Sequence, residues 1–246
     1  MMRVTQRVDI VDHVFVLLLV LVQPIHGAMA YRRFIGRIRA GLVPNRVRLY
    51  AETMVIEWMA LAVLLLAWST LSRPVADLGL VVPQGIGFWT GVVVVLSLTA
   101  VLYRSWRKVG AMAEADKARQ RVLLGDLVQF LPTTDRHFRY FTGLSVTAGI
   151  VEEVVYRGFL LWYLTFYTPL WAAVLLSSAA FGLGHSYQGV AGVIKTLVVG
   201  AAFAIMYVAT GSIWLPIVAH IVVDLLQGAT ILALLRQSPA PEPSTG

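Results

Sequence analysis

The sequence predicts an all-α fold, a polytopic bundle of transmembrane helices, and two observations lead to this prediction. Hydrophobic residues make up 58% of the 246 residues, charged residues only 13%, and the mean hydropathy is +0.76. These values lie outside the range of soluble globular proteins. Apolar runs long enough to cross ~30 Å of hydrocarbon also recur along the chain. We therefore expect one helical membrane bundle without a sizeable soluble domain.

Seven apolar segments are expected to span the membrane, and the pattern is compatible with six to eight. They lie near residues 11–30, 51–71, 86–105, 139–161, 169–186, 190–209 and 212–235. Residues 122–131 (VLLGDLVQFL) are apolar but too short to span. They suit an interfacial helix, and a connector packed on the bundle fits them equally well. The polar, proline-rich residues 237–246 are expected to form a disordered tail.

The distribution of Lys and Arg predicts the orientation of the bundle. Fourteen of the 20 basic residues fall in or beside the first and third loops, between residues 32 and 48 and between residues 104 and 139. The positive-inside rule places these loops in the cytoplasm, so seven spans put the N-terminus outside and the C-terminus inside. We expect a multi-pass protein of the bacterial inner membrane. The basic charge then matches anionic lipid headgroups and gives no reason to expect nucleic-acid binding.

The first apolar run also has features of a signal peptide, with Ala28-Met29-Ala30 as the cleavage site. Two features favour a retained helix. Asp9 and Asp12 are unsuited to the positive start of a signal peptide, and cleavage would leave the arginine-rich first loop outside. The chain has no cysteine, which excludes disulfides, cysteine nucleophiles and thiolate metal sites.

Six ionisable residues lie inside or at the edges of the later apolar segments. They occur in EEVVYR (152–157), FGLGH (181–185) and HIVVD (220–224), as Glu152, Glu153, Arg157, His185, His220 and Asp224. Placing a charge in hydrocarbon costs from a few to more than ~10 kcal/mol. We expect these side chains to meet in one polar pocket that performs chemistry.

Helix geometry gives the two glutamates different roles. Glu153 and Arg157 are four residues apart, in the order that favours an ion pair on one helix face. Glu152 points about 100° away and has no basic residue at the third or fourth following position. Glu152 is therefore the candidate general base, and Glu153 and Arg157 form the supporting pair. A purely structural cluster is the alternative.

The histidines add two further positions. His220 and Asp224 share one helix face because they are four residues apart, and His185 ends an apolar segment in a glycine-rich turn. Asp224 can orient the imidazole of His220, or both can ligate a metal. A hydrogen-bonded pair that joins helices, with His185 an interfacial residue, is the structural alternative.

The motifs EExxxR, FxxxH and HxxxN/D, in this order on separate apolar segments, resemble the CPBP intramembrane proteases. This family comprises CAAX-processing endopeptidases and bacteriocin-processing or self-immunity proteins, the Abi group. The resemblance covers about residues 139–235. It implies a catalytic transmembrane core at 139–236, after N-terminal helices and cytoplasmic loops at 1–138.

The resemblance also implies a glutamate-dependent endopeptidase that cuts a membrane-associated protein or peptide. Glu152 would be the general base, His185 would help to hold the attacking water, and His220 with Asp224 would stabilise the oxyanion. Glu153 and Arg157 match the supporting positions. CAAX-type members often carry Asn where this chain has Asp224, and an ionised Asp donates no hydrogen bond.

Several alternatives stay open. We expect no cofactor, but Glu152, His185, His220 and Asp224 also offer oxygen and nitrogen ligands for a zinc-dependent form of the same protease. A non-enzymatic immunity or assembly protein of the same fold is a second alternative. A proton-coupled transporter that uses the buried Glu and His residues as a relay is a third.

Overall fold

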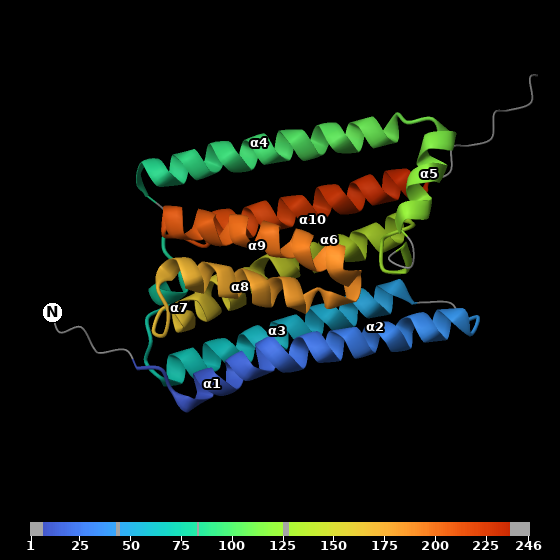
Figure 1. Cartoon of the computed structure of the whole chain (residues 1–246). Helices are drawn as coiled ribbons and strands as arrows, with labels where there is room; N and C mark the ends of the chain where they lie inside the picture. Colours follow the sequence, from blue (N-terminus) through green and yellow to red (C-terminus); the bar gives the residue numbers. More distant parts are fainter. Residues whose placement is uncertain (1–6, 43–44, 83, 125–127, 237–246) are drawn as a thin grey trace, which may run out of the picture.

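The computed structural model describes residues 7–42, 45–82, 84–124 and 128–236. Throughout these ranges, all regular secondary structure is helical. Figure 1 shows the long helices lying side by side along one common direction, joined by short connections. The predicted all-α transmembrane bundle is therefore confirmed.

The helices follow one another along the chain with few long loops. In order they are α1 (Ile10–Leu17), η1 (Leu18–Val22), α2 (Gln23–Arg39), α3 (Arg46–Thr70), η2 (Val75–Leu78), α4 (Gly85–Gly110), α5 (Glu114–Leu124), α6 (Asp135–Glu153), η4 (Val154–Leu160), α7 (Leu161–Leu164), α8 (Leu170–Gly184), η5 (Ser186–Gln188), α9 (Gly189–Thr210) and α10 (Trp214–Leu235). α1, η1 and α2 form one continuous helical run, as do α6, η4 and α7. In each run the middle part is a π-helix, whose wider turn often occurs at functional sites.

Five helical stretches in the described part of the chain are long and apolar enough to cross a membrane. They are Ile10–Arg39, Arg46–Thr70, Gly85–Gly110, Ser186–Thr210 and Trp214–Leu235. The fifth expected span is the shorter apolar helix α8 (Leu170–Gly184). The fourth is the run from α6 to α7, which contains the charged motif EEVVYR. The number of spans agrees roughly with the prediction. The run from α6 to α7 is the expected span with the charged motif, and it lies where the candidate site was expected.

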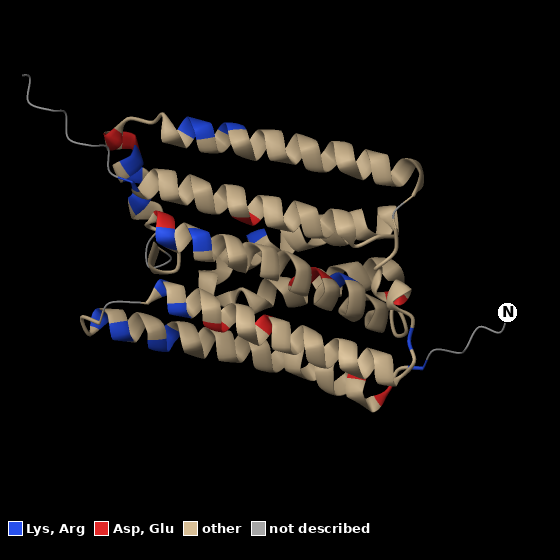
Figure 2. Ribbon diagram, turned by 180° about the vertical axis from the view of Figure 1, so that it is seen from behind, with Lys and Arg blue, Asp and Glu red and all other residues tan. Residues whose placement is uncertain are grey.

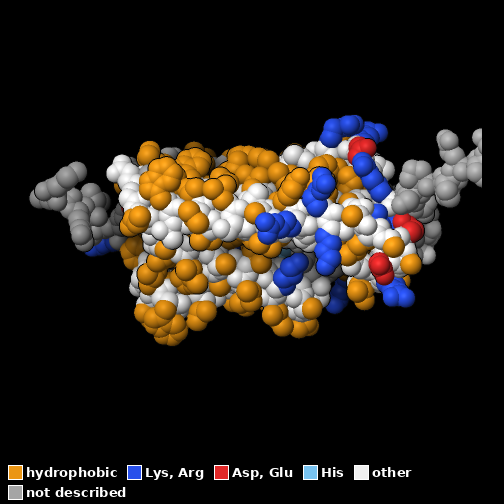
Figure 3. All heavy atoms as spheres, turned by 90° about the horizontal axis from the view of Figure 1, so that it is seen from above, with side chains coloured by type: hydrophobic (Ala, Val, Ile, Leu, Met, Phe, Trp, Pro, Cys, Tyr) orange, Lys and Arg blue, Asp and Glu red, His pale blue; other side chains and the backbone are white. Residues whose placement is uncertain are grey.

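Basic side chains gather at one end of the bundle (Figure 2). The end of α10 also lies at this end, whereas the chain enters α1 at the opposite end (Figure 1). Apolar side chains cover much of the rest of the face in Figure 3. This separation of basic and apolar surface fits an integral membrane protein. The cytoplasmic side of the bundle and the bacterial inner membrane stay predictions.

The segment expected to form an interfacial helix at 122–131 is divided in the structure. α5 covers its first part and ends at Leu124, residues 125–127 lie outside the described residues, and Phe130 lies in a turn. Arg46 donates to the backbone oxygen of Val128 (3.4 Å) and Tyr50 to that of Phe130. These bonds hold the segment after α5 on α3, so a packed connector describes residues 128–131 better than an interfacial helix. The expected disordered tail, 237–246, lies outside the described residues.

A buried ion pair joins the first helix to the end of α3. The two terminal nitrogens of Arg73, Nη1 and Nη2, donate to the carboxylate of Asp12, each at 2.7 Å. The two side chains are only 6% and 5% exposed. The guanidinium also lies 5.1 Å from the ring of Trp68 and 4.8 Å from that of Trp162. The first helix is thus an integral part of the bundle.

Asp12→Ala should lower the free energy of unfolding by about 3 kcal/mol, because it leaves the buried Arg73 charge without its partner. The matched control is Glu52→Ala, since Glu52 pairs with Arg48 at 2.6 Å on the surface of α3. An exposed pair of this kind contributes at most about 1 kcal/mol. Denaturant unfolding in detergent micelles measures both changes. Equal effects of the two substitutions would contradict the structural role of the Asp12–Arg73 pair.

Candidate active site

The candidate site begins where α6 passes into η4. Arg157 donates from Nη1 to Glu153 Oε1 at 2.8 Å and from Nη2 to the carbonyl oxygen of Gly200 at 3.1 Å. The guanidinium carbon lies 4.2 Å from the ring centre of Phe181 on α8. Glu153 and Arg157 are 0% and 1% exposed. The ion pair predicted from the spacing is therefore present, and it connects three helices.

Gly200 is required for this arrangement because of its missing side chain. A β-carbon at this position would lie 2.9 Å from the ring of Phe181 and 3.2 Å from Nη2 of Arg157. α9 can therefore bring its backbone carbonyl against the guanidinium only with glycine here. The buried charge of Arg157 is thus satisfied by one carboxylate, one carbonyl and one aromatic face.

His220 reaches the same carboxylate from α10. Its Nδ1 lies 2.8 Å from Glu153 Oε1, and because an ionised carboxylate only accepts, Nδ1–H is the donor. The imidazole is buried, and the ring of Phe203 lies 5.5 Å from it. Glu153 therefore fixes the orientation of His220. Sequence spacing suggested Asp224 for this role.

Nε2, the other nitrogen of His220, faces two further carboxylates. Glu152 Oε2 lies 3.8 Å from it and Asp224 Oδ2 lies 3.7 Å from it. Oε2 of Glu152 is buried and has no hydrogen-bond partner within the described ranges. Unsatisfied buried acceptors are rare in proteins and call for an explanation. The two oxygens and Nε2 form a small polar group.

His185 lies at the turn between α8 and η5. Its Nδ1 is 2.9 Å from the carbonyl oxygen of Phe181, so the ring donates there and Nε2 is left for other partners. The ring of Phe181 lies 5.0 Å from that of His185 and 6.0 Å from that of His220. His185 is also close enough to Asp224 to act on its charge. The structure therefore brings His185 to the edge of the group formed by the other predicted residues.

Two residues of this region were not among the predicted site residues. Glu57 lies on α3, and its Oε2 is buried without a hydrogen-bond partner in the described structure. The charges that act on it are those of Glu152, His220 and Asp224. Tyr187 follows His185 closely, and its ring lies 6.0 Å from that of His185 and 6.1 Å from that of Phe130. A second helix predicted to begin at Arg46 would have placed Glu57 deep within it. Nothing in the local sequence indicates that Tyr187 lies beside the site.

The donor atoms do not converge in the manner of a metal site. Among the described residues, no group of three or more His, Cys, Asp or Glu side chains is arranged to hold a metal ion. Of the predicted zinc ligands, Glu152 and Asp224 lie 3.8 and 3.7 Å from Nε2 of His220, and His185 lies beside the ring of Phe181. We therefore derive no step through a metal, and the zinc-dependent alternative stays a prediction.

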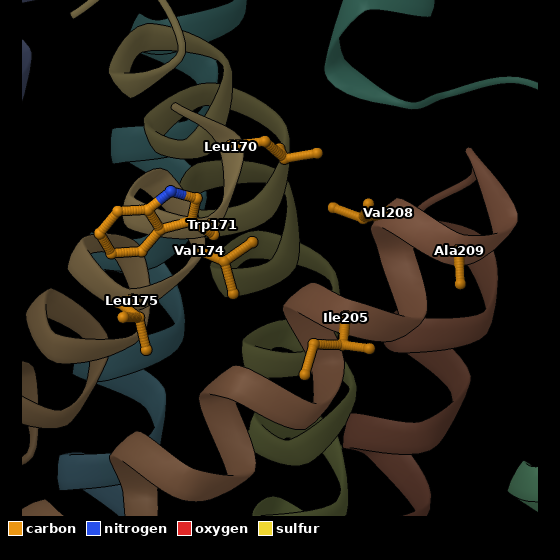
Figure 4. Close-up of a pocket in the computed structure, with 7 residues that line it drawn as sticks. All are labelled: Leu170, Trp171, Val174, Leu175, Ile205, Val208 and Ala209. Carbon is orange, nitrogen blue, oxygen red and sulfur yellow. The ribbon is translucent and has the colours of Figure 1, made fainter. Parts of the chain in front are cut away.

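A separate apolar groove of about 650 Å³ lies between α8 and α9 (Figure 4). It is lined by Leu170, Trp171, Val174, Leu175, Ile205, Val208 and Ala209. None of these side chains carries a group able to act as acid, base or nucleophile. The groove is therefore distinct from the polar group around His220.

Comparison with known proteins gives a family for the part of the chain that contains the polar group. Residues 136–226 match the family model described as type II CAAX prenyl endopeptidase Rce1-like. The predicted family is confirmed. This CPBP-type core extends from the start of α6 into α10 and contains all six predicted site residues. It indicates an intramembrane protease of the CAAX type, and such a protease acts on a membrane-associated protein. No curated protein and no solved structure matches the chain.

Arg157→Met should reduce the free energy of unfolding by about 3 kcal/mol, since it leaves the buried Glu153 carboxylate without its cation. Adding Glu153→Gln should restore part of this loss, because the uncompensated charge is then removed. Arg48→Met, at an exposed pair, serves as the control. Chemical unfolding of the wild type, Arg157→Met, Glu153→Gln and the double variant gives the coupling energy, and strictly additive effects would contradict the buried pair.

Proposed function

We propose that the protein is an intramembrane endopeptidase that hydrolyses a peptide bond of a membrane-associated protein substrate. The observation that carries this proposal is the unsatisfied Oε2 of Glu152, buried and 3.8 Å from Nε2 of His220. A free carboxylate oxygen beside an imidazole nitrogen is suited to activate a water molecule against a polarised carbonyl group. The match of residues 136–226 to the CAAX endopeptidase family favours this chemistry over other uses of a buried carboxylate.

In the proposed reaction, Glu152 takes one proton from water as the water oxygen attacks the carbonyl carbon of the substrate. The carbonyl oxygen becomes an oxyanion in a tetrahedral intermediate. The intermediate collapses as the carbon–nitrogen bond breaks, and Glu152 returns the proton to the leaving amine. The products are a carboxylic acid and an amine, so no other reactant is required.

His220 stabilises the oxyanion through Nε2–H. Because Glu153 holds Nδ1–H, only the doubly protonated imidazole has a hydrogen at Nε2 as well. Glu153 and Asp224 supply the negative charge that balances this imidazolium. Asp224 therefore acts through His220 and does not itself donate to the oxyanion. His185, which is held by the carbonyl of Phe181, directs its free nitrogen toward the water.

Glu152→Gln should reduce kcat by roughly 100- to 10,000-fold, the range for loss of a general base. Glutamine has nearly the same shape, so KM and thermal stability should change little. The assay uses the purified protein in proteoliposomes with lipid-anchored peptides that carry a fluorophore and quencher on either side of the cleaved bond. Glu52→Gln, at a surface carboxylate, is the control.

Cleavage by the Glu152 variant at the wild-type rate would overturn the proposed base. A wild-type protein that cleaves none of these peptides, nor any protein of its native membrane, would favour a non-enzymatic immunity or assembly role. Proton uptake by the liposomes without cleavage would favour a transporter.

A metal-free reaction should retain its full rate after treatment with 1,10-phenanthroline, and metal analysis should find less than stoichiometric zinc. The chelated protein is assayed with the same peptides before and after addition of Zn²⁺. Loss of activity that Zn²⁺ restores would establish the zinc-dependent alternative, with its ligands among Glu152, His185, His220 and Asp224.

A further inference from the structure

Glu57 lies deep within α3, and its position follows from where that helix begins. The helix starts at Arg46, so Glu57 is eleven residues into it, or about 16 Å along the axis at 1.5 Å per residue. Glu52, one and a half turns earlier, is exposed and pairs with Arg48. The two glutamates of this helix therefore differ in depth and in partners.

The contacts between α3 and α6 fix the level of Glu57 along the bundle. Trp58 donates to the hydroxyl of Thr147 at 3.1 Å. One turn earlier on both helices, a β-carbon at Gly143 would lie 3.3 Å from the sulfur of Met54. From the first contact to the second, the residue number falls by four on both helices, so the two helices run parallel in this region. Glu57 is thus level with the residue that precedes Thr147.

The contacts between α6 and α10 place Asp224 at a similar level. A β-carbon at Gly149 would lie 2.5 Å from the side chain of Ile221, and one at Gly228 would lie 2.3 Å from the ring of Phe141. These contacts describe an antiparallel pair of helices. Asp224 lies between the two α10 positions and therefore opposite the middle of the segment from residue 141 to residue 149.

Glu57 and Asp224 thus approach α6 from two helices at nearly the same level. Nε2 of His220 connects this level with Glu152, since Glu152 Oε2 lies 3.8 Å and Asp224 Oδ2 lies 3.7 Å from it. Glu57 is buried and lies within electrostatic reach of Glu152, His220 and Asp224. Glu57 therefore belongs to the polar group around His220.

Some oxygens of these carboxylates have no hydrogen-bond donor among the described residues. Glu153 accepts from Arg157 and His220 through Oε1, whereas Oε2 of Glu57, of Glu152 and of Glu153 is buried without a partner in the described part of the chain. An unsatisfied buried acceptor costs about 1–3 kcal/mol, and more when it is charged. The two acceptors on Glu57 and Glu152 suit a ligand with two hydrogens to donate, and water is the smallest such ligand.

We propose that Glu57 is a further catalytic residue: its carboxylate accepts one hydrogen of the attacking water while Glu152 accepts the other. This inference rests on the proposed function, because the water is the nucleophile of that reaction. Glu152 removes the proton it accepts, and Glu57 keeps its hydrogen bond and so fixes the direction of the water lone pair. No bond to Glu57 is made or broken.

Glu57→Gln and Glu57→Ala test the inference, with Glu52→Gln on the same helix as the matched control. A water held by one carboxylate is poorly oriented, so kcat should fall about 10- to 100-fold in both variants, while KM stays within about twofold. The melting temperature of Glu57→Gln should be equal to or higher than that of the wild type, because glutamine keeps the shape of the side chain and never carries a charge in the buried site. Glu52→Gln should alter none of these quantities.

Unchanged kcat in both Glu57 variants would overturn the inference, and so would a kcat that falls together with the melting temperature. The proposed function fails separately, when the wild type cleaves nothing or Glu152→Gln has no effect. A readout independent of cleavage is a structure of the wild type and of Glu57→Gln at a resolution that shows waters. The inference expects a water between Glu57 and Glu152 that is lost or displaced in the variant, and a wild-type pocket without that water contradicts it.

Discussion

The carboxylate of Glu153 is the group on which the rest of this site depends. One oxygen accepts from Arg157 and from His220, and both partners come with further contacts to α8, α9 and α10. A carboxylate, a guanidinium and an imidazole are stable in an apolar interior only when they satisfy one another. The folding of four helices around Glu153 and the orientation of the imidazole of His220 are therefore consequences of the same interaction.

This arrangement separates structural and reactive carboxylates. Glu153 is completely buried, and its Oε1 accepts from two strong donors while its Oε2 has no partner among the described residues. Oε2 of its neighbour Glu152 also has no partner there, and it lies 3.8 Å from Nε2 of His220. The π-helical turn η4 follows directly after this pair and contains Arg157. Glu153 and Arg157 still make their contact across the wider turn. Neighbouring residues of the same type thus acquire different chemistry through the helices that each one faces.

Local geometry explains how much of the site was predictable. The Glu153–Arg157 pair needs only the spacing of one helix, and the fold class needs only long apolar runs. The bond between His220 and Glu153 joins residues 67 positions apart, so it depends on the register of α6 against α10, which one sequence does not contain. The burial of Glu57 was not predicted, because hydropathy placed the start of the second span near residue 51, whereas α3 begins at Arg46. The choice between an interfacial helix and a packed connector for 122–131 also depended on tertiary packing, since α5 ends at Leu124 and the backbone at Val128 and Phe130 is held by side chains of α3.

The central claim is that a peptide bond is hydrolysed at the polar group formed by Glu152 and Nε2 of His220. The most direct measurement is a structure of the full-length protein with a lipid-anchored peptide whose scissile bond is replaced by a phosphinate, a mimic of the tetrahedral intermediate. Our account predicts one phosphinate oxygen within hydrogen-bond distance of His220 Nε2 and the other beside Glu152. Binding of the phosphinate elsewhere, for example in the apolar groove between α8 and α9, would contradict it.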